Sequence, residues 1–287
     1  MSSAIRFPGA RAATACAVLV CAVLVVSCFV ARAEEKGPVT LTFNLPEGTA
    51  LSYESFNQLS RNFNGMDVSM NQTSKVDLSY AGGADSTGAS HVDLKYIEVK
   101  SSLVSGGRIQ EWSPPIMLEG TTIKVSIDSR GHVVAFDPGR HVRGLSDPEE
   151  LRELVEAWFV KFPEGEIAPG GSWTEKIEMG KRQDGSFGTT GELVYTFKKV
   201  ENKDGIDVAV IEGKMKLVLN QEQEEGMLVG KGEGKIKAKV ALSGGYVVEL
   251  KESIDIKGDI VVKDPLTDRE TKHETVLTQT YERKLRE

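Results

Sequence analysis

Two histidines and two aspartates lie within a single fourteen-residue segment, and their side chains could support acid–base or metal chemistry. The segment reads DSRGHVVAFDPGRH and contains Asp128, His132, Asp137 and His141. Imidazole and carboxylate groups bind zinc and similar ions, and a histidine beside a carboxylate can transfer protons during hydrolysis. The spacing matches no HExxH-type signature, however, and Gly131 and Pro138 predict turns around a short strand. We therefore favour solvated turn residues and expect no metal site.

Other signatures of catalysis are missing from the sequence. No G-x-S-x-G elbow, phosphate-binding loop or G-x-G-x-x-G motif occurs. The glycine-rich GKGEGK at 230–235 lies in an alternating strand pattern, with no following helix to present a phosphate site. We expect a protein that is not an enzyme, with no catalytic residue and no cofactor. A hydrolase would require His132, His141 and the nearby aspartates to converge.

The first 33 residues have the three parts of an export signal. Arg6 and Arg11 precede an uncharged run over 12–31, and a small-x-small cleavage site ends at Ala33. Cleavage there is the favoured outcome and predicts a periplasmic or extracellular protein. A lipobox ending at Cys28 is the alternative, because lipidation of this cysteine would anchor the protein to a membrane. An uncut run that spans the membrane is a third possibility.

The composition of residues 34–287 excludes some partners and some forms of stabilisation. The first 33 residues contain three arginines and no acidic residue, so cleavage leaves 32 basic and 42 acidic residues, a net charge of -10. This charge argues against nucleic acid, because binding to phosphates needs a positive surface. All three cysteines also lie before residue 34. The remaining chain must be stabilised without internal disulfides.

Apolar and polar residues alternate along most of residues 34–287, which is typical of strands with one buried face. The longest run, 66–80, has Met66, Met70 and Tyr80 on one face, and a shorter run covers 39–45. Glycine-rich turns separate the runs, and short turns join neighbouring strands antiparallel. We predict a mainly β fold in one domain, a long antiparallel meander curved into a half-barrel. A two-sheet sandwich is the alternative.

One segment has the periodicity of a helix instead. Residues 146–162 begin with capping residues, and apolar side chains recur at helical spacing up to Trp158, Phe159 and Phe162, before Pro163. This amphipathic helix divides the chain into two β-rich halves, 39–145 and 163–287. Each half opens with a Pro/Gly turn and an aromatic strand, so a duplication into two lobes is a further possibility.

The helix could complete the core or cover an apolar cavity in the curved sheet, because ligand pockets are often mostly apolar. If a cavity forms, we expect its lining to include Met66, Met70, Tyr80, Trp158, Phe159 and Phe162. Core packing is the more common role of such an apolar stripe. A second feature is the lysine-rich strand at 231–239, which could contact anionic headgroups or an acidic partner. A solvated strand face explains the same lysines.

An export signal with a possible lipobox, a long β meander and one amphipathic helix together resemble bacterial lipoprotein carriers of the LolA, LolB and LppX type. The chain is also similar to exported bacterial proteins with a pGxxW turn, here at 169–173. The resemblance is architectural and implies a curved sheet that could hold acyl chains. We therefore expect a non-catalytic envelope protein that binds an apolar or lipid ligand. The alternative is a structural or protein-binding envelope protein with a filled core.

Overall fold

The computed structural model describes residues 37–63, 65–82, 88–112, 117–139, 142, 148–181, 186–223, 226–263, 267 and 269–286. The predicted export segment with Cys28 lies outside these residues, as does His141. The described elements are β1 (Val39–Thr40), β2 (Ala50–Phe63), β3 (Met66–Gly82), β4 (Ser90–Ser105), β5 (Arg108–Glu111), β6 (Thr122–Ile127), β7 (Val133–Asp137), α2 (Pro148–Glu156), β8 (Glu166–Ile167), β9 (Ser172–Lys181), β10 (Phe187–Lys203), β11 (Ile206–Gln223), β12 (Gly226–Ala241), β13 (Val247–Lys263) and β14 (Glu270–Leu285).

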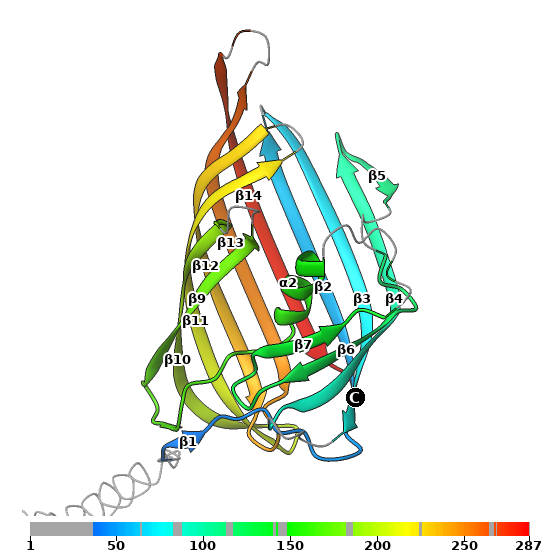
Figure 1. Cartoon of the computed structure of the whole chain (residues 1–287), viewed down its shortest axis with the longest axis vertical. Helices are drawn as coiled ribbons and strands as arrows, with labels where there is room; N and C mark the ends of the chain where they lie inside the picture. The colour runs from blue at the N-terminus through cyan, green and yellow to red at the C-terminus, as the bar shows by residue number, and fades with distance from the viewer. Residues whose placement is uncertain are drawn as a thin grey trace, which may run out of the picture. The chain divides into compact units, whose positions relative to one another are not determined.

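Twelve of the described strands form one antiparallel sheet, which curves around α2 (Figure 1). Its order is β7-β6-β4-β3-β2-β14-β13-β12-β11-β10-β9, with β5 paired to β4. Two meanders therefore meet where β2 pairs with β14, and β7 and β9 are left as open edges. The predicted half-barrel is confirmed, in place of the alternative two-sheet sandwich. In the sequence, one meander precedes the helix and the other follows it, as predicted for the two halves. Their origin by duplication stays a prediction.

The predicted helix was too long at its C-terminal end, because α2 ends at Glu156 and not at residue 162. The backbone N–H groups of Trp158 and Phe159 donate to the carbonyls of Val155 and Glu156, each three residues earlier. Such bonds close turns and end the regular helix. The three predicted aromatic residues therefore follow the helix, in an irregular segment over 157–163.

This irregular segment is held by a loop that is distant in sequence. The N–H of Phe162 donates to the carbonyl of Arg130 at 2.8 Å, and the Arg130 Nε donates to the carbonyl of Phe162 at 3.1 Å. The helix itself contacts both β7 and β9. Residues 148–163 thus connect the two open edges of the sheet.

We define the inner face of the sheet as the face that carries the core and faces α2. The neighbouring strands β12 and β13 approach each other closely at two glycines. Gly230 of β12 and Gly258 of β13 lie directly opposite each other in the ladder. A Cβ on Gly230 would lie 2.7 Å from the carbonyl oxygen of Lys257, and a Cβ on Gly258 would clash with the carbonyl of Val229. Glycine is therefore required for the backbones to approach this closely.

The run at 39–45 is mostly not a strand, which corrects the prediction for this segment. Only Val39–Thr40 pairs, with β8. The chain stays extended, and Leu41, Phe43 and Leu45 are buried, but the N–H of Phe43 donates to the Ser129 carbonyl in a loop. In the part of the chain that is described, no helix has both the length and the apolar character needed to cross a bilayer.

Candidate functional site on the inner face of the sheet

The aromatic residues after α2 belong to the core. Trp158 and Phe159 are each 7% exposed, and Phe162 is completely buried. The indole Nε1 of Trp158 donates to the Tyr96 hydroxyl at 3.0 Å, and burial raises the pKa of Tyr96. Phe159 packs edge-on against Phe43, with ring centroids 5.5 Å apart. Protein side chains fill the inner face at this level, and the ligand contact predicted for these residues stays a prediction.

The three predicted ligand-binding residues of β3 do not come together. Tyr80 packs against the core, Met70 is half-buried, and Met66, at the start of the strand, is 63% exposed. Tyr80 lies fourteen positions after Met66, which corresponds to roughly 45 Å along an extended strand. Val76 lies between them and pairs with Tyr53 and with Tyr96, the two tyrosines that contact Trp158. Tyr80 and the two methionines therefore lie on opposite sides of the aromatic cluster.

Arg283 lies at the boundary of this cluster and is the largest fully buried side chain among the described residues, with 1% exposure. Its guanidinium carbon is 4.6 Å from the ring centroid of Trp158 and 5.6 Å from that of Tyr53. Cations stack on aromatic faces at such distances because the ring face carries negative partial charge. In the ladder, Arg283 pairs with Ser55 of β2 and Leu250 of β13.

Beyond Arg283 the inner face is first polar and then carries apolar side chains together with Gln279 and Arg61. The next row of paired residues is half-buried and consists of Asn57, Tyr281 and Glu252. Burial raises the pKa of Glu252, and the positive charge of Arg283 opposes this shift. The two rows after that contain six half-buried apolar side chains, one of which is Val68. The other five we call the distal apolar patch: Leu59, Met70, Ile254, Ile256 and Leu277. Figure 1 shows β2, β3, β13 and β14 extending well past α2 in this direction.

Of the residues in the distal apolar patch, the polar row and the Arg283 position, only Met70 was predicted from the sequence to bind a ligand. The signal for Arg283 was present, since it shares the alternation of Leu277, Tyr281 and Leu285 in β14 and is a charge at an inward position. The pairing of β2 with β14 could not be read locally, because it joins residues more than 200 positions apart, such as Asn57 and Gln279, whose side chains hydrogen-bond at 3.1 Å.

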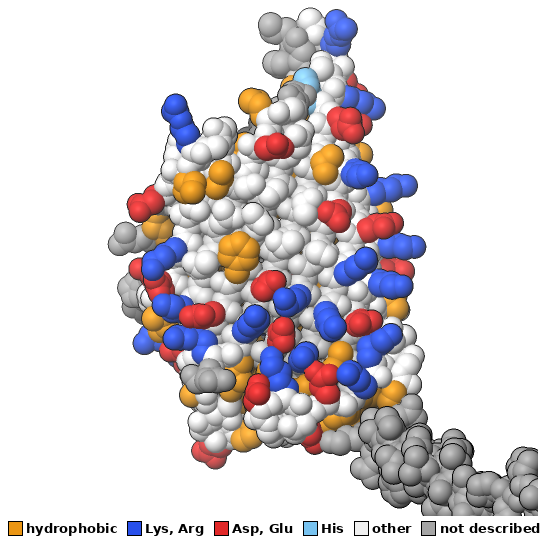
Figure 2. Space-filling model, turned by 180° about the vertical axis from the view of Figure 1, so that it is seen from behind, with side chains coloured by type: hydrophobic (Ala, Val, Ile, Leu, Met, Phe, Trp, Pro, Cys, Tyr) orange, Lys and Arg blue, Asp and Glu red, His pale blue; other side chains and the backbone are white. Residues whose placement is uncertain are grey.

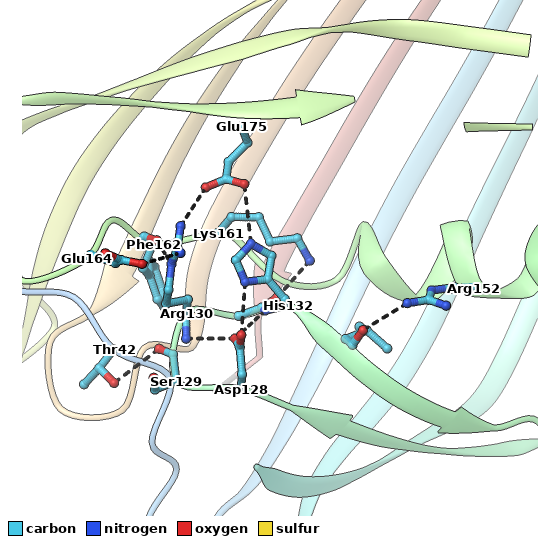
Figure 3. A network of polar contacts seen from close by, with 12 residues as sticks. Thr42, Asp128, Ser129, Arg130, His132, Arg152, Lys161, Phe162, Glu164 and Glu175 are labelled. Atoms are coloured by element: carbon cyan, nitrogen blue, oxygen red, sulfur yellow. Dashed lines mark hydrogen bonds and ion pairs between the residues drawn. The ribbon is translucent and has the colours of Figure 1, made fainter. Parts of the chain in front are cut away.

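Two of the predicted acid–base candidates, Asp128 and His132, form part of a polar network at the other end of the inner face (Figure 3). The Oδ2 of Asp128 lies 3.1 Å from the Nδ1 of His132, and the Oε2 of Glu175 lies 3.4 Å from its Nε2. Burial acts to raise the pKa of Asp128, but hydrogen bonds from the backbone and ring of His132 and from the Arg130 N–H outweigh it, so the pKa is lowered.

This network ties three segments together. Arg130 forms ion pairs with Glu164 at 3.1 Å and Glu175 at 3.4 Å, and the Lys161 ammonium donates to the carbonyl of Gly131 at 2.8 Å. Burial lowers the pKa of Lys161, against the attraction of nearby carboxylates. The loop at 128–132 is thereby joined to the segment after α2 and to β9. Such hydrogen bonds and ion pairs are typical of a structural network that holds segments together.

The chemistry available to this network is limited within the described residues. His132 is held between two carboxylates, and no described serine, threonine or cysteine hydrogen-bonds to it. Asp137 accepts a hydrogen bond from the N–H of Gly139 at 2.9 Å and does not join the network. Among the same residues, no group of histidine, cysteine and acidic side chains has the arrangement needed to hold a metal ion.

The outer face carries charges of both signs, interspersed as Figure 2 shows. The lysine-rich strand predicted at 231–239 is β12, and its lysines point outward. The ladder places lysines directly opposite each other in three cross-strand pairs, Lys214–Lys235, Lys231–Lys257 and Lys237–Lys251, and places Glu233 opposite Asp255. Such pairs repel and disfavour the folded sheet. Acidic residues such as Glu233 lie among them.

No protein-family model and no curated protein sequence matches the chain. A solved structure of lipovitellin, described in terms of lipid–protein interactions, is similar over 84% of this chain with a TM-score of 0.51 and 7% identity. The match covers 25% of the lipovitellin chain, so this chain spans about a quarter of that protein's length. At this identity the likeness concerns the fold alone, a large curved antiparallel sheet.

Two other solved structures match with low scores. OccK5 (OpdH) of Pseudomonas aeruginosa matches over 84% of this chain and 98% of its own, with a TM-score of 0.21 and 7% identity. A DUF1329 family protein of Desulfovibrio piger matches over 80% and 84%, with a TM-score of 0.13 and 12% identity. With its fold-level support from the lipovitellin match, the resemblance expected from the sequence is confirmed as one of architecture, and it transfers no site residue.

Proposed function

We propose that this chain is an exported, non-catalytic envelope protein that binds a lipid or another apolar ligand against the distal apolar patch. The patch is the observation that carries the proposal. Its five side chains continue the inner face of the sheet past the filled aromatic cluster, and they are half-buried where the core residues below them are fully buried. An apolar ligand bound to this face would remove the remaining exposed surface of these side chains from water.

The energetics favour an extended hydrocarbon chain over a compact ligand. Each methylene group removed from water contributes about 0.8 kcal/mol. The patch spans two rows of side chains across β3, β2, β14 and β13, so a linear chain can contact several side chains at once. Met70 adds an adaptable surface, because its side chain is flexible and polarisable. The fold-level likeness to lipovitellin, which is described by its lipid–protein interactions, supports the same ligand class.

A second function, a structural or partner-binding protein with a filled core, is favoured by a different observation. Trp158, Phe159 and Phe162 are buried and leave the inner face closed at their level. The repelling lysine pairs of the outer face would be relieved by an acidic partner or by anionic headgroups. This alternative requires no ligand on the inner face.

Organic extraction of the purified chain followed by mass spectrometry separates the two functions. The proposed function predicts a co-purifying lipid or other apolar molecule at a defined ratio to protein. It also predicts that the molecule is depleted when Ile256 of the patch is replaced by glutamate. A protein that carries no such molecule, and that binds none when a lipid mixture is supplied, would favour the filled-core alternative.

A further inference from the structure

Arg283 is a buried cation that the described residues leave without a hydrogen-bond acceptor. None of its Nε, Nη1 and Nη2 atoms has a partner among them, although the side chain is only 1% exposed. A guanidinium presents five N–H donors, and burying a charge without acceptors is strongly unfavourable. Stacking on Trp158 and Tyr53 offsets only part of this cost, since it satisfies no donor.

The carboxyl group best placed to neutralise Arg283 is Glu252, and it does not do so directly. Glu252 lies on β13, diagonally across the ladder from Arg283. No ion pair joins the two among the described residues. Burial raises the pKa of Glu252, which favours its neutral form, although Arg283 opposes the shift. Among the residues that the structure describes, the positive charge therefore has no fixed counter-charge.

The position of Arg283 connects this charge with the proposed ligand face. Only the half-buried row of Asn57, Tyr281 and Glu252 separates it from the distal apolar patch. Successive rows on one face of a strand lie roughly 7 Å apart. A headgroup at the polar row would thus reach the guanidinium while its chain extended along Ile254 and Ile256.

We infer that the ligand is an anionic amphiphile, with one acidic oxygen group bound by Arg283 and an apolar chain on the distal apolar patch. This inference rests on the proposed function and specifies its ligand class. A carboxylate or a phosphate matches the planar fork of a guanidinium, which can donate two parallel hydrogen bonds to it. Trp158 and Tyr53 hold the guanidinium in place from the other side.

The test compares ligands that share one chain and differ in the headgroup. Dodecanoate, dodecyl phosphate and 1-dodecanol are titrated against the whole purified protein, with displacement of a neutral fluorescent dye as the readout. We expect at least one acid to bind about tenfold or more tightly than the alcohol, the gain typical of a charge-assisted hydrogen bond. The stronger of the two acids identifies the headgroup.

Matched variants locate the charge. Arg283→Met should remove the preference for the acid and leave the affinity for dodecanol almost unchanged. Lys284→Met, which removes a charge from the outer face of the same strand, should change neither affinity, and Arg61→Met tests the other arginine of the inner face. If Arg283→Met does not fold, the preference of the wild type for acid over alcohol still tests the ligand class.

The outcomes separate failure of this inference from failure of the proposed function. Equal binding of acid and alcohol by the wild type would overturn the anionic class and leave apolar binding intact. A preference that survives in Arg283→Met but disappears in Arg61→Met would overturn the role of Arg283. If no ligand of the three binds, both the inference and the proposed function are wrong.

Discussion

The guanidinium of Arg283 stacks on the indole of Trp158 at 4.6 Å, and the indole donates its own hydrogen bond to the Tyr96 hydroxyl. This contact marks the boundary between two parts of the inner face. On one side, aromatic residues fill the core. On the other, the sheet carries a polar row and then the distal apolar patch. The aromatic part is tested by measurements of stability, and the part with the distal apolar patch is tested by measurements of ligand binding.

Replacing Trp158 tests whether the aromatic cluster is core. Trp158→Ala should lower the free energy of unfolding by about 3–5 kcal/mol, the usual cost of deleting a buried large aromatic side chain. Trp158→Phe should cost less, because it removes the hydrogen bond to Tyr96 and part of the stacking on Arg283 but keeps most of the volume. Denaturant unfolding measures both. A loss below 1 kcal/mol for the alanine variant would show that the site tolerates an empty volume.

Replacing Asp128 tests whether the polar network between the loop at 128–132 and the segment after α2 stabilises the fold. Its pKa is lowered in the folded state, so the carboxylate stabilises the protein above its unfolded pKa of about 3.9, and this contribution disappears as the pH falls through the folded value. Asp128→Asn should cost roughly 1 kcal/mol at neutral pH, an amount limited by solvent screening of a side chain that is 37% exposed.

The same unfolding measurements repeated across acidic pH provide the control for Asp128. The difference between wild type and Asp128→Asn should shrink toward zero below about pH 3.9. A difference that is independent of pH would mean that the loss arises from packing or backbone effects and not from the charge.

Replacing Gly258 tests whether β12 and β13 approach each other closely at this position. Gly258→Ala should destabilise the protein by about 1–3 kcal/mol, the typical cost of overpacking, because its Cβ would meet the carbonyl of Val229. Gly82→Ala is the matched control at the end of β3, where an added Cβ meets nothing within 4 Å. Equal thermal stabilities for the two variants would contradict the close approach.

Much of this fold is readable from the sequence, and the limits have physical causes. Period-two alternation identifies the long strands because each buries one face. The end of α2 is not readable, since residues 157–163 leave the helix to bond with a loop some thirty positions earlier, as in the pair formed by Arg130 and Phe162. The distal apolar patch is assembled from β2, β3, β13 and β14, so its members come together only through long-range pairing.

Glu252 should make binding of an acidic ligand depend on pH. Its pKa is raised by burial and lowered again in part by Arg283, and Tyr195 also lies within electrostatic range. A neutral Glu252 leaves Arg283 available, whereas an ionised one competes for it and repels the ligand. The affinity for dodecanoate should therefore fall as the pH rises through the raised pKa of Glu252, in the range where the ligand stays ionised.

The variant Glu252→Gln is the control for this pH dependence. It should hold the affinity for dodecanoate constant over the same range, at or above the wild-type value near neutral pH. Binding of dodecanol should not change with pH in either protein. A pH dependence that persists in Glu252→Gln would assign the titration to another group.

Binding of a neutral fluorescent apolar dye to wild type, Ile256→Glu and Val218→Glu tests the central claim most directly. Both substitutions place a carboxylate on an apolar strand position, Ile256 on the inner face within the distal apolar patch and Val218 on the outer face, where it is 54% exposed. We predict that Ile256→Glu weakens dye binding about tenfold or more while Val218→Glu binds as the wild type does. Equal binding by the two variants, or no binding by the wild type, would contradict a ligand site on the inner face of the sheet.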